Sequence, residues 1–177
     1  LKNCYRQYRQ YSKVQTVLKN NLISLLDTVF PNVNRLFNSP VRADGSEKWV
    51  DFVAEFWHCE CICERSEKAF VSKYQKWCKK HGYNFGEEKA CAIYAEASGH
   101  IGVMPKSETT KLLVEQAVAQ LRATSAALTA LKREMLTLAA QLPEYPAVMG
   151  MFGVGPTLGP QLIAEISDVR RFYSKKA

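Results

Sequence analysis

Apolar side chains recur every seven residues near both ends of the chain, and this spacing predicts two long helices, one over residues 1–30 and one over residues 107–142. Seven-residue spacing is typical of a coiled coil, in which the apolar stripe of one helix packs against another helix. Pro31 ends the first helix, because proline disrupts the helical hydrogen-bond pattern. We therefore predict that the two helices form an antiparallel pair. The positions that carry the spacing are Cys4, Tyr11, Leu18 and Leu25 in the first helix, and Val114, Leu121, Leu128, Met135 and Leu142 in the second.

Residues 31–106 are predicted to form a small helical subdomain inserted between the long helices. Its first helix begins near Ser46, whose hydroxyl can cap a helix N-terminus. A second helix carries three aromatic residues at helical spacing, and a third helix follows Gly86. No segment shows the alternation of apolar and polar residues that is typical of a half-buried strand.

A glycine-rich junction follows the second long helix and carries the most informative motif. Residues 143–160 contain four of the seven Pro and four of the nine Gly of the chain. A short apolar helix is predicted to lead into Gly153, Val154 and Gly155, where the glycines permit a tight turn. A second helix is predicted to begin at Pro156, because proline is favoured in the first helical turn.

The backbone amides at the start of that second helix are predicted to bind phosphate. The N–H groups of Gly155, Thr157 and Leu158 are expected to point outward there, and a helix N-terminus favours an anion. Gly159 allows the two helices to touch. This arrangement resembles a helix-hairpin-helix motif, which contacts the nucleic-acid backbone without reading base sequence. The predicted fold class is all-α, with long antiparallel coiled-coil helices, an inserted small helical subdomain and a C-terminal helix-hairpin-helix-like motif.

Charge supports the same interpretation. The 177 residues hold 24 Lys and Arg against 17 Asp and Glu, a net charge of +7 that favours a polyanionic partner. Near the N-terminus, basic residues alternate with tyrosines, a combination that suits nucleic acid, although the tyrosines are also expected at the helix seam. The residues predicted to bind nucleic acid are Arg6, Arg9, Lys13, Gly153, Val154, Gly155, Thr157, Arg170, Arg171, Lys175 and Lys176.

The six cysteines do not indicate a secreted disulfide scaffold, because the chain is long and apolar enough to bury a core without crosslinks. Reduced thiols in the cytoplasm are therefore expected. Residues 58–63 and 78–81 hold Cys and His, which are zinc ligand types, but structural zinc sites pair their ligands at a different spacing. We favour thiols that pack beside aromatic side chains, with zinc as the alternative. No run approaches the ~20 apolar residues of a membrane span, so no membrane partner is expected.

The stretch from Leu142 to Phe172 resembles the start of the C-terminal transposase domain of the insertion sequence 110 family. The helix around Leu18 to Leu22 and the segments 49–63 and 77–85 also resemble a branch of that family, so the likeness covers essentially the whole chain. The runs that carry it most strongly are Gly153-Val154-Gly155-Pro156-Thr157-Leu158-Gly159-Pro160-Gln161-Leu162 and Asp168-Val169-Arg170-Arg171-Phe172.

The resemblance implies a DNA recombinase that moves its own element, acts as a homo-oligomer and, in some members, uses a structured guide RNA. It also implies an acidic set that binds a divalent metal such as Mg²⁺, expected upstream of Leu1, and a nucleophilic Ser expected downstream of Ala177. We therefore expect residues 1–177 to contain no catalytic residue, no metal ligand and no cofactor. We also expect this chain alone to cleave no DNA. The segments would be a first coiled-coil helix (1–30), the insert (31–106), a second coiled-coil helix (107–142) and the start of the transposase domain (143–177).

Two other functions fit the same sequence. The chain could be a non-catalytic helix-hairpin-helix adaptor for nucleic acid, or a coiled-coil assembly protein whose positive charge is incidental. The complete reading frame separates a transposase from an adaptor. The salt dependence of nucleic-acid binding separates both from an assembly protein, because phosphate neutralisation gives a steep dependence.

Overall fold

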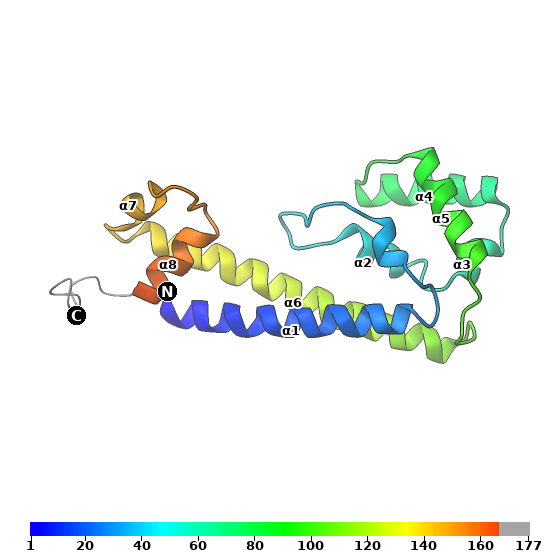
Figure 1. Cartoon of the computed structure of the whole chain (residues 1–177), viewed down its shortest axis with the longest axis horizontal. Coiled ribbons are helices and arrows are strands. Elements are labelled where there is room, and N and C mark those ends of the chain that lie inside the picture. The colour runs from blue at the N-terminus through cyan, green and yellow to red at the C-terminus, as the bar shows by residue number, and fades with distance from the viewer. Residues whose placement is uncertain (167–177) are drawn as a thin grey trace. The chain divides into compact units, whose positions relative to one another are not determined.

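A computed structural model describes residues 1–166, and its regular elements within that range are all helical, which confirms the all-α prediction. The basic residues Arg170, Arg171, Lys175 and Lys176 lie outside the described residues. No helix within 1–166 has the length and hydropathy to cross a membrane. The elements are α1 (Lys2–Leu26), η1 (Val33–Leu36), α2 (Lys48–Val53), α3 (Glu60–Cys63), α4 (Glu67–His81), α5 (Glu87–Gly99), α6 (Glu108–Ala140), α7 (Tyr145–Met149) and α8 (Leu158–Ile166) (Figure 1).

The two long helices α1 and α6 form where seven-residue spacing predicts them. Helix α1 ends at Leu26, a turn earlier than Pro31, because the chain tightens there. The hydroxyl of Thr28 donates to the carbonyl of Leu25 at 2.6 Å, and the amide of Val29 donates to the carbonyl of Leu26 at 3.0 Å. These three-residue bonds replace the helical pattern before the proline is reached.

The described chain divides into two compact units, and each long helix contributes to both. Residues 16–123 form one, which we call the central unit, and residues 1–15 with the chain from Thr124 onward form the other, which we call the terminal unit. These limits divide α1 and α6 in mid-helix, whereas the predicted segments run from one helix end to the other.

An aromatic core fills the central unit. Phe52 and Phe56 stack with ring centroids 4.7 Å apart, and α4 adds Phe70, Tyr74 and Trp77 on one helical face. All five side chains are at least nine-tenths buried. Such rings bury large apolar areas and add edge-to-face contacts, so they account for much of the stability of this unit. Residues of the long helices complete the core, namely Leu22, Leu26, Val114, Ala117, Val118 and Leu121.

The start of α2 differs from the prediction. Ser46 does not cap it, because Glu47 is the N-cap residue and no side chain bonds the first-turn amides. Both the amide and the hydroxyl of Ser46 donate to the carboxylate of Asp44, at 2.9 and 2.7 Å, and form a tight turn instead. The carboxylate of Glu47 pairs with Lys19 of α1 at 2.6 Å and accepts the indole N–H of Trp49 at 2.9 Å.

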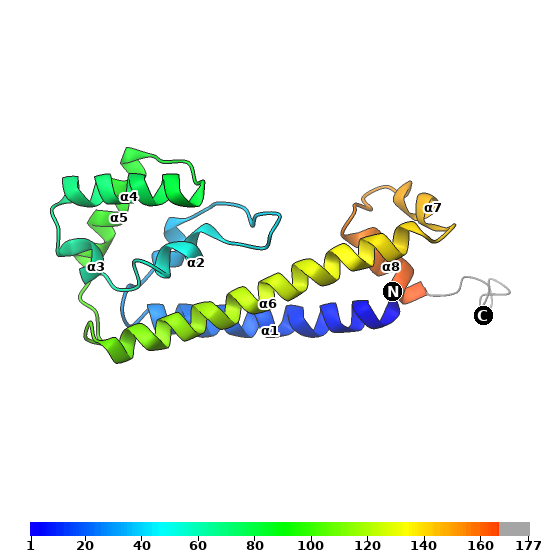
Figure 2. The ribbon, with the colours of Figure 1, turned by 180° about the vertical axis from the view of Figure 1, so that it is seen from behind.

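The terminal unit contains the first part of α1, the second part of α6, and the short helices α7 and α8 (Figure 2). A polar pair lies between the long helices in this unit, because Gln15 donates to the hydroxyl of Ser125 at 2.8 Å. Its buried apolar side chains among residues 1–166 are Leu128, Met135, Ala139, Pro160, Ile163 and Ala164.

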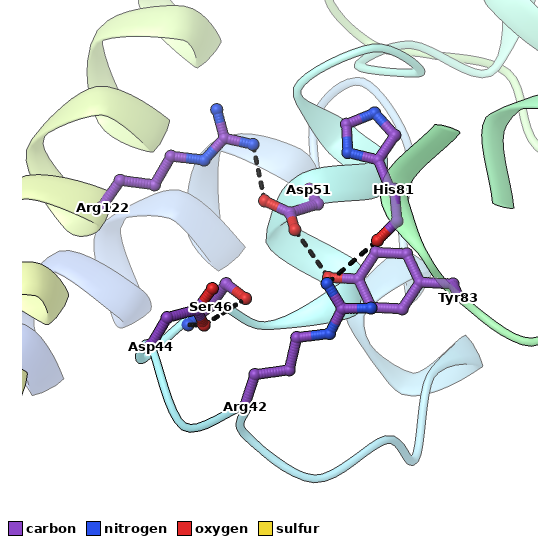
Figure 3. A network of polar contacts seen from close by, with 7 residues as sticks. All are labelled: Arg42, Asp44, Ser46, Asp51, His81, Tyr83 and Arg122. Carbon is purple, nitrogen blue, oxygen red and sulfur yellow. Dashed lines mark hydrogen bonds and ion pairs between the residues drawn. The ribbon is translucent and has the colours of Figure 1, made fainter. Parts of the chain in front are cut away.

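A polar network fixes one face of the central unit, and Asp51 is its centre (Figure 3). One carboxylate oxygen accepts the hydroxyl of Tyr83 at 2.6 Å, and the other accepts the guanidinium of Arg122 at 2.6 Å. The guanidinium of Arg42 lies 3.8 Å from the ring centroid of Tyr83 and donates to the carbonyls of His81 and Gly82. The network therefore joins α2, the end of α4 and α6.

Tyr83 makes this network sensitive to alkaline pH. Burial, the hydrogen bond to Asp51 and the charge of that carboxylate together raise the pKa of Tyr83 from 10.0 to about 12. As pH rises, the unfolded chain loses this proton first. The stability that the hydroxyl contributes is therefore fully present below pH 10 and is lost as pH rises towards about 12.

We predict that Tyr83→Phe lowers the free energy of unfolding at pH 7 by about 1.5 to 3 kcal/mol, the usual contribution of a hydrogen bond to a charged group. Chemical denaturation measures this change. The same variant should lose less stability than the wild type between pH 10 and about 12, because the shifted group is gone. Tyr11→Phe, which removes a partly exposed hydroxyl, is the control, and a Tyr83→Phe profile that follows the wild type across this range would contradict the prediction.

Candidate nucleic-acid interface

Three of the predicted nucleic-acid-binding residues share one hollow on α1. Arg6, Arg9 and Lys13, together with Gln10, line an open pocket of about 360 Å³, which we call the basic pocket. Residues three, four and seven positions apart lie on the same face of a helix, so the sequence itself brings these side chains together. Gln10 was not predicted, but its position four residues after Arg6 is the signal that identifies it.

The charges of the basic pocket are only partly compensated. Arg9 pairs with Glu165 of α8 at 3.3 Å, and its guanidinium lies 5.8 Å from the ring centroid of Tyr5. The Arg9–Glu165 pair is more than half exposed on both sides, so it contributes little stability. Arg6 and Lys13 form no ion pair with a carboxylate of residues 1–166. The pocket therefore keeps an excess of positive charge that faces solvent.

The glycine loop, residues 150–157, joins α7 and α8 in the same unit. Gly153 has a φ of +79°, a left-handed conformation that favours glycine. A Cβ added at Gly155 would meet nothing within 4 Å. Gly153 and Thr157 are exposed, whereas Val154 and Gly155 are half-buried. The glycine loop is thus an open turn.

Helix α8 begins at Leu158, two residues later than predicted. The amide of Gly159 donates to the carbonyl of Gly155 at 2.9 Å. The amides of Gly155, Thr157 and Leu158 donate to no acceptor within residues 1–166, and both Thr157 and Leu158 are exposed. The first turn of α8 therefore presents backbone donors towards solvent, as an anion site requires.

Gly159 allows α7 and α8 to pack closely. A Cβ at this position would lie 2.6 Å from the sulfur of Met149, and Val154 and Tyr145 are the next neighbours. Gly159 itself is buried. The close approach of these two helices, which the glycine spacing predicts, is present in the structure.

Among the cysteine and histidine side chains, those of His58, Cys59 and Cys78 are buried. Among residues 1–166, no group of three or more His, Cys, Asp and Glu is arranged to hold a metal ion. The imidazole of His58 is buried, with Nε2 3.0 Å from the carbonyl of Met104 and Nδ1 accepting the amide of Glu60 at 3.1 Å. Burial raises the pKa of the Cys61 and Cys78 thiols.

Comparisons of this chain with protein-family models, curated proteins and solved structures gave no match.

We predict that the two glycines of the loop differ in their effect on stability. Gly153→Ala should lower the free energy of unfolding by about 1 to 2 kcal/mol, because a side chain is disfavoured at positive φ. Gly155→Ala should change it by less than about 0.5 kcal/mol, because its Cβ enters open space. Thermal and chemical denaturation of both variants measure the difference, and equal losses at the two positions would show that the loop has another conformation.

Proposed function

We propose that this chain is part of a DNA transposase of the insertion sequence 110 family, in which it contributes nucleic-acid binding and oligomerisation. The observation that supports the binding role concerns the terminal unit. It holds an incompletely neutralised basic pocket on α1 and, at the start of α8, solvent-facing amides without an acceptor among the described residues. The ion pair between Arg9 and Glu165 joins the two helices that carry these features.

Both features suit the sugar–phosphate backbone. The amides of Thr157 and Leu158 can donate to phosphate oxygens, and the positive end of the α8 dipole favours the same charge. Arg6 and Lys13 neutralise further phosphates and release counterions. Neither feature reads a base edge, so binding is expected to be insensitive to sequence. In this proposal the α7–α8 pair acts as a helix-hairpin-helix motif and the long helices act as a coiled coil.

The family resemblance favours a transposase over a free-standing adaptor. Under the proposal, strand cleavage is carried out by the acidic magnesium-binding residues and the nucleophilic Ser of other segments. Residues 1–177 bind DNA and a structured guide RNA. The complete reading frame tests that assignment directly. A frame without an acidic domain before residue 1 and without a Ser-bearing domain after residue 177 would leave the adaptor as the better description.

We predict that Arg6→Gln/Lys13→Gln weakens binding to a short DNA duplex by about fivefold or more at physiological salt. The slope of log affinity against log salt should fall by about 1.8, since each lost phosphate contact removes about 0.9. Fluorescence anisotropy over a series of salt concentrations measures both quantities. Arg9 is left unchanged because it also contacts Glu165.

The matched control is Lys132→Gln/Arg133→Gln, which removes two exposed cations from α6 in the same unit. Its affinity should stay within about twofold of the wild type, because long-range charge effects are screened at physiological salt. Gly155→Val tests the loop in the same assay and should reduce affinity with little loss of stability, because its Cβ enters open space beside the amides. Unchanged affinity in both the Arg6/Lys13 and the Gly155 variants would refute this interface.

Self-association is the second role, and a groove in the central unit favours it. Leu18, Asn21, Leu25, Leu113, Gln116, Ala117 and Gln120 line an open groove of about 370 Å³ along α1 and α6. Leu113, which lines the groove, is 45% exposed, and Val17 on α1 is 65% exposed. Contiguous exposed apolar surface of this kind marks a protein–protein interaction site. A helix of a second copy would cover this apolar surface in coiled-coil fashion.

We predict that Leu113→Glu shifts the chain towards the monomer, because a buried carboxylate without a partner opposes association. Light scattering coupled to size exclusion measures the change. Leu112→Glu is the control, because Leu112 is 53% exposed but does not line the groove. The same mass for Leu113→Glu and the wild type, with an oligomeric wild type, would exclude this groove as the contact surface.

A further inference from the structure

Three cations from separate segments of the central unit gather over a pair of aromatic rings. Arg42 precedes α2, Lys48 begins α2 and Lys89 lies in the first turn of α5. The ammonium of Lys48 lies 5.3 Å from the ring centroid of Tyr83 and 5.9 Å from that of Phe37. The guanidinium of Arg42 lies 3.8 Å from the ring centroid of Tyr83, and the ammonium of Lys89 lies 5.7 Å from that of Phe37. We call these three residues the cationic patch.

The charge of the cationic patch is not neutralised by the protein residues described. Other cations of the central unit, such as Lys19 and Arg122, pair with carboxylates. Within residues 1–166, none of the three patch cations forms such an ion pair. Their acceptors are neutral carbonyls, which are those of His81 and Gly82 for Arg42 and that of Asn84 for Lys48.

The surroundings disfavour this positive charge. Burial lowers the pKa of Lys48, and the charges of Lys89 and Arg42 lower it further. Asp44, whose charge interacts with that of Arg42, is exposed and already accepts two hydrogen bonds from Ser46. Asp51 already accepts the hydroxyl of Tyr83 and the guanidinium of Arg122. An added anion would therefore remove mutual repulsion among three cations as well as gain direct contacts.

The patch offers donors for such an anion. The ammonium of Lys48 has three hydrogens, and Asn84 is the one acceptor among residues 1–166 to which it bonds. Contacts with aromatic rings and carbonyls already hold the patch side chains, so little side-chain entropy remains to be lost on binding. Phe85 follows directly after Asn84, is 36% exposed and contacts Tyr74 with centroids 6.1 Å apart. Its free edge provides a surface on which a base can stack.

We propose that the cationic patch of Arg42, Lys48 and Lys89 binds a phosphate group of a nucleic-acid strand, as a second contact separate from the basic pocket. This inference rests on the proposed nucleic-acid-binding function and extends it to the inserted subdomain. Arg42 mainly positions the site, because two of its donors bond the carbonyls at the end of α4. Lys48 and Lys89 make the contact with phosphate.

The test uses the full chain with Lys48→Gln/Lys89→Gln, which removes both charges, keeps polar unbranched side chains and leaves Arg42 in place. Binding to a single strand of about 20 nucleotides should weaken about fivefold, and the salt slope should fall by about 1.4, since each contact to a single strand contributes about 0.7. Lys68→Gln/Lys76→Gln, which removes two exposed lysines from α4, should bind within about twofold of the wild type. Unchanged affinity and slope in Lys48→Gln/Lys89→Gln would overturn the proposal.

Protection of lysines from an amine-reactive reagent, read by mass spectrometry, locates the contact. The strand should protect Lys48 and Lys89 but not Lys68, in the wild type and also in the Arg6→Gln/Lys13→Gln variant. Protection by inorganic phosphate alone would support the site with a free anion as its source. A wild type that binds no strand contradicts both proposals, whereas strand binding that is reduced only by the Arg6/Lys13 variant, with Lys48 and Lys89 unprotected, contradicts this one alone.

Discussion

The apolar stripes of two long helices are the constraint on which the rest of the structure depends. Helix α6 has 33 residues and is about 50 Å long at 1.5 Å per residue. A single straight helix cannot cover its own apolar stripe, so other elements must pack against it. In the central unit, Val114, Val118 and Leu121 join the aromatic core of the insert. In the terminal unit, Leu128 and Met135 are covered. The aromatic core of the inserted subdomain therefore covers part of the α6 stripe.

Much of the fold follows from periodicity alone. The spacing of Phe70, Tyr74 and Trp77 predicts α4, and the seven-residue series predicts α1 and α6, because burial of one face decides those elements. Local capping was less predictable. Ser46 is a good cap residue by type, but Asp44 is close enough in sequence to bond it first. Such competition between neighbouring polar groups depends on small differences in backbone geometry.

The basic pocket was predictable because it lies on one helix, and the glycine loop was predictable from its local spacing. Arg6, Arg9 and Lys13 share a face through their spacing, and the structure places them in one pocket. Arg42, Lys48 and Lys89 belong to three segments, and only the packing of α2 and α5 around Phe37 brings them together. Sequence also gives no sign that Arg9 pairs with Glu165, since the two residues are 156 positions apart. Tertiary packing, rather than local pattern, decides which cations stay unneutralised.

The polar pair between Gln15 and Ser125 has a consequence for how α1 and α6 align. A hydrogen bond between side chains, placed on an otherwise apolar stripe, is satisfied in one register only. If either helix slid by a heptad, Val118 or Lys132 would replace Ser125 opposite Gln15. Neither side chain accepts a hydrogen bond, so the amide of Gln15 would lose its acceptor, at a cost of about 1 to 3 kcal/mol. The repeat alone permits several alignments, and this one pair selects among them.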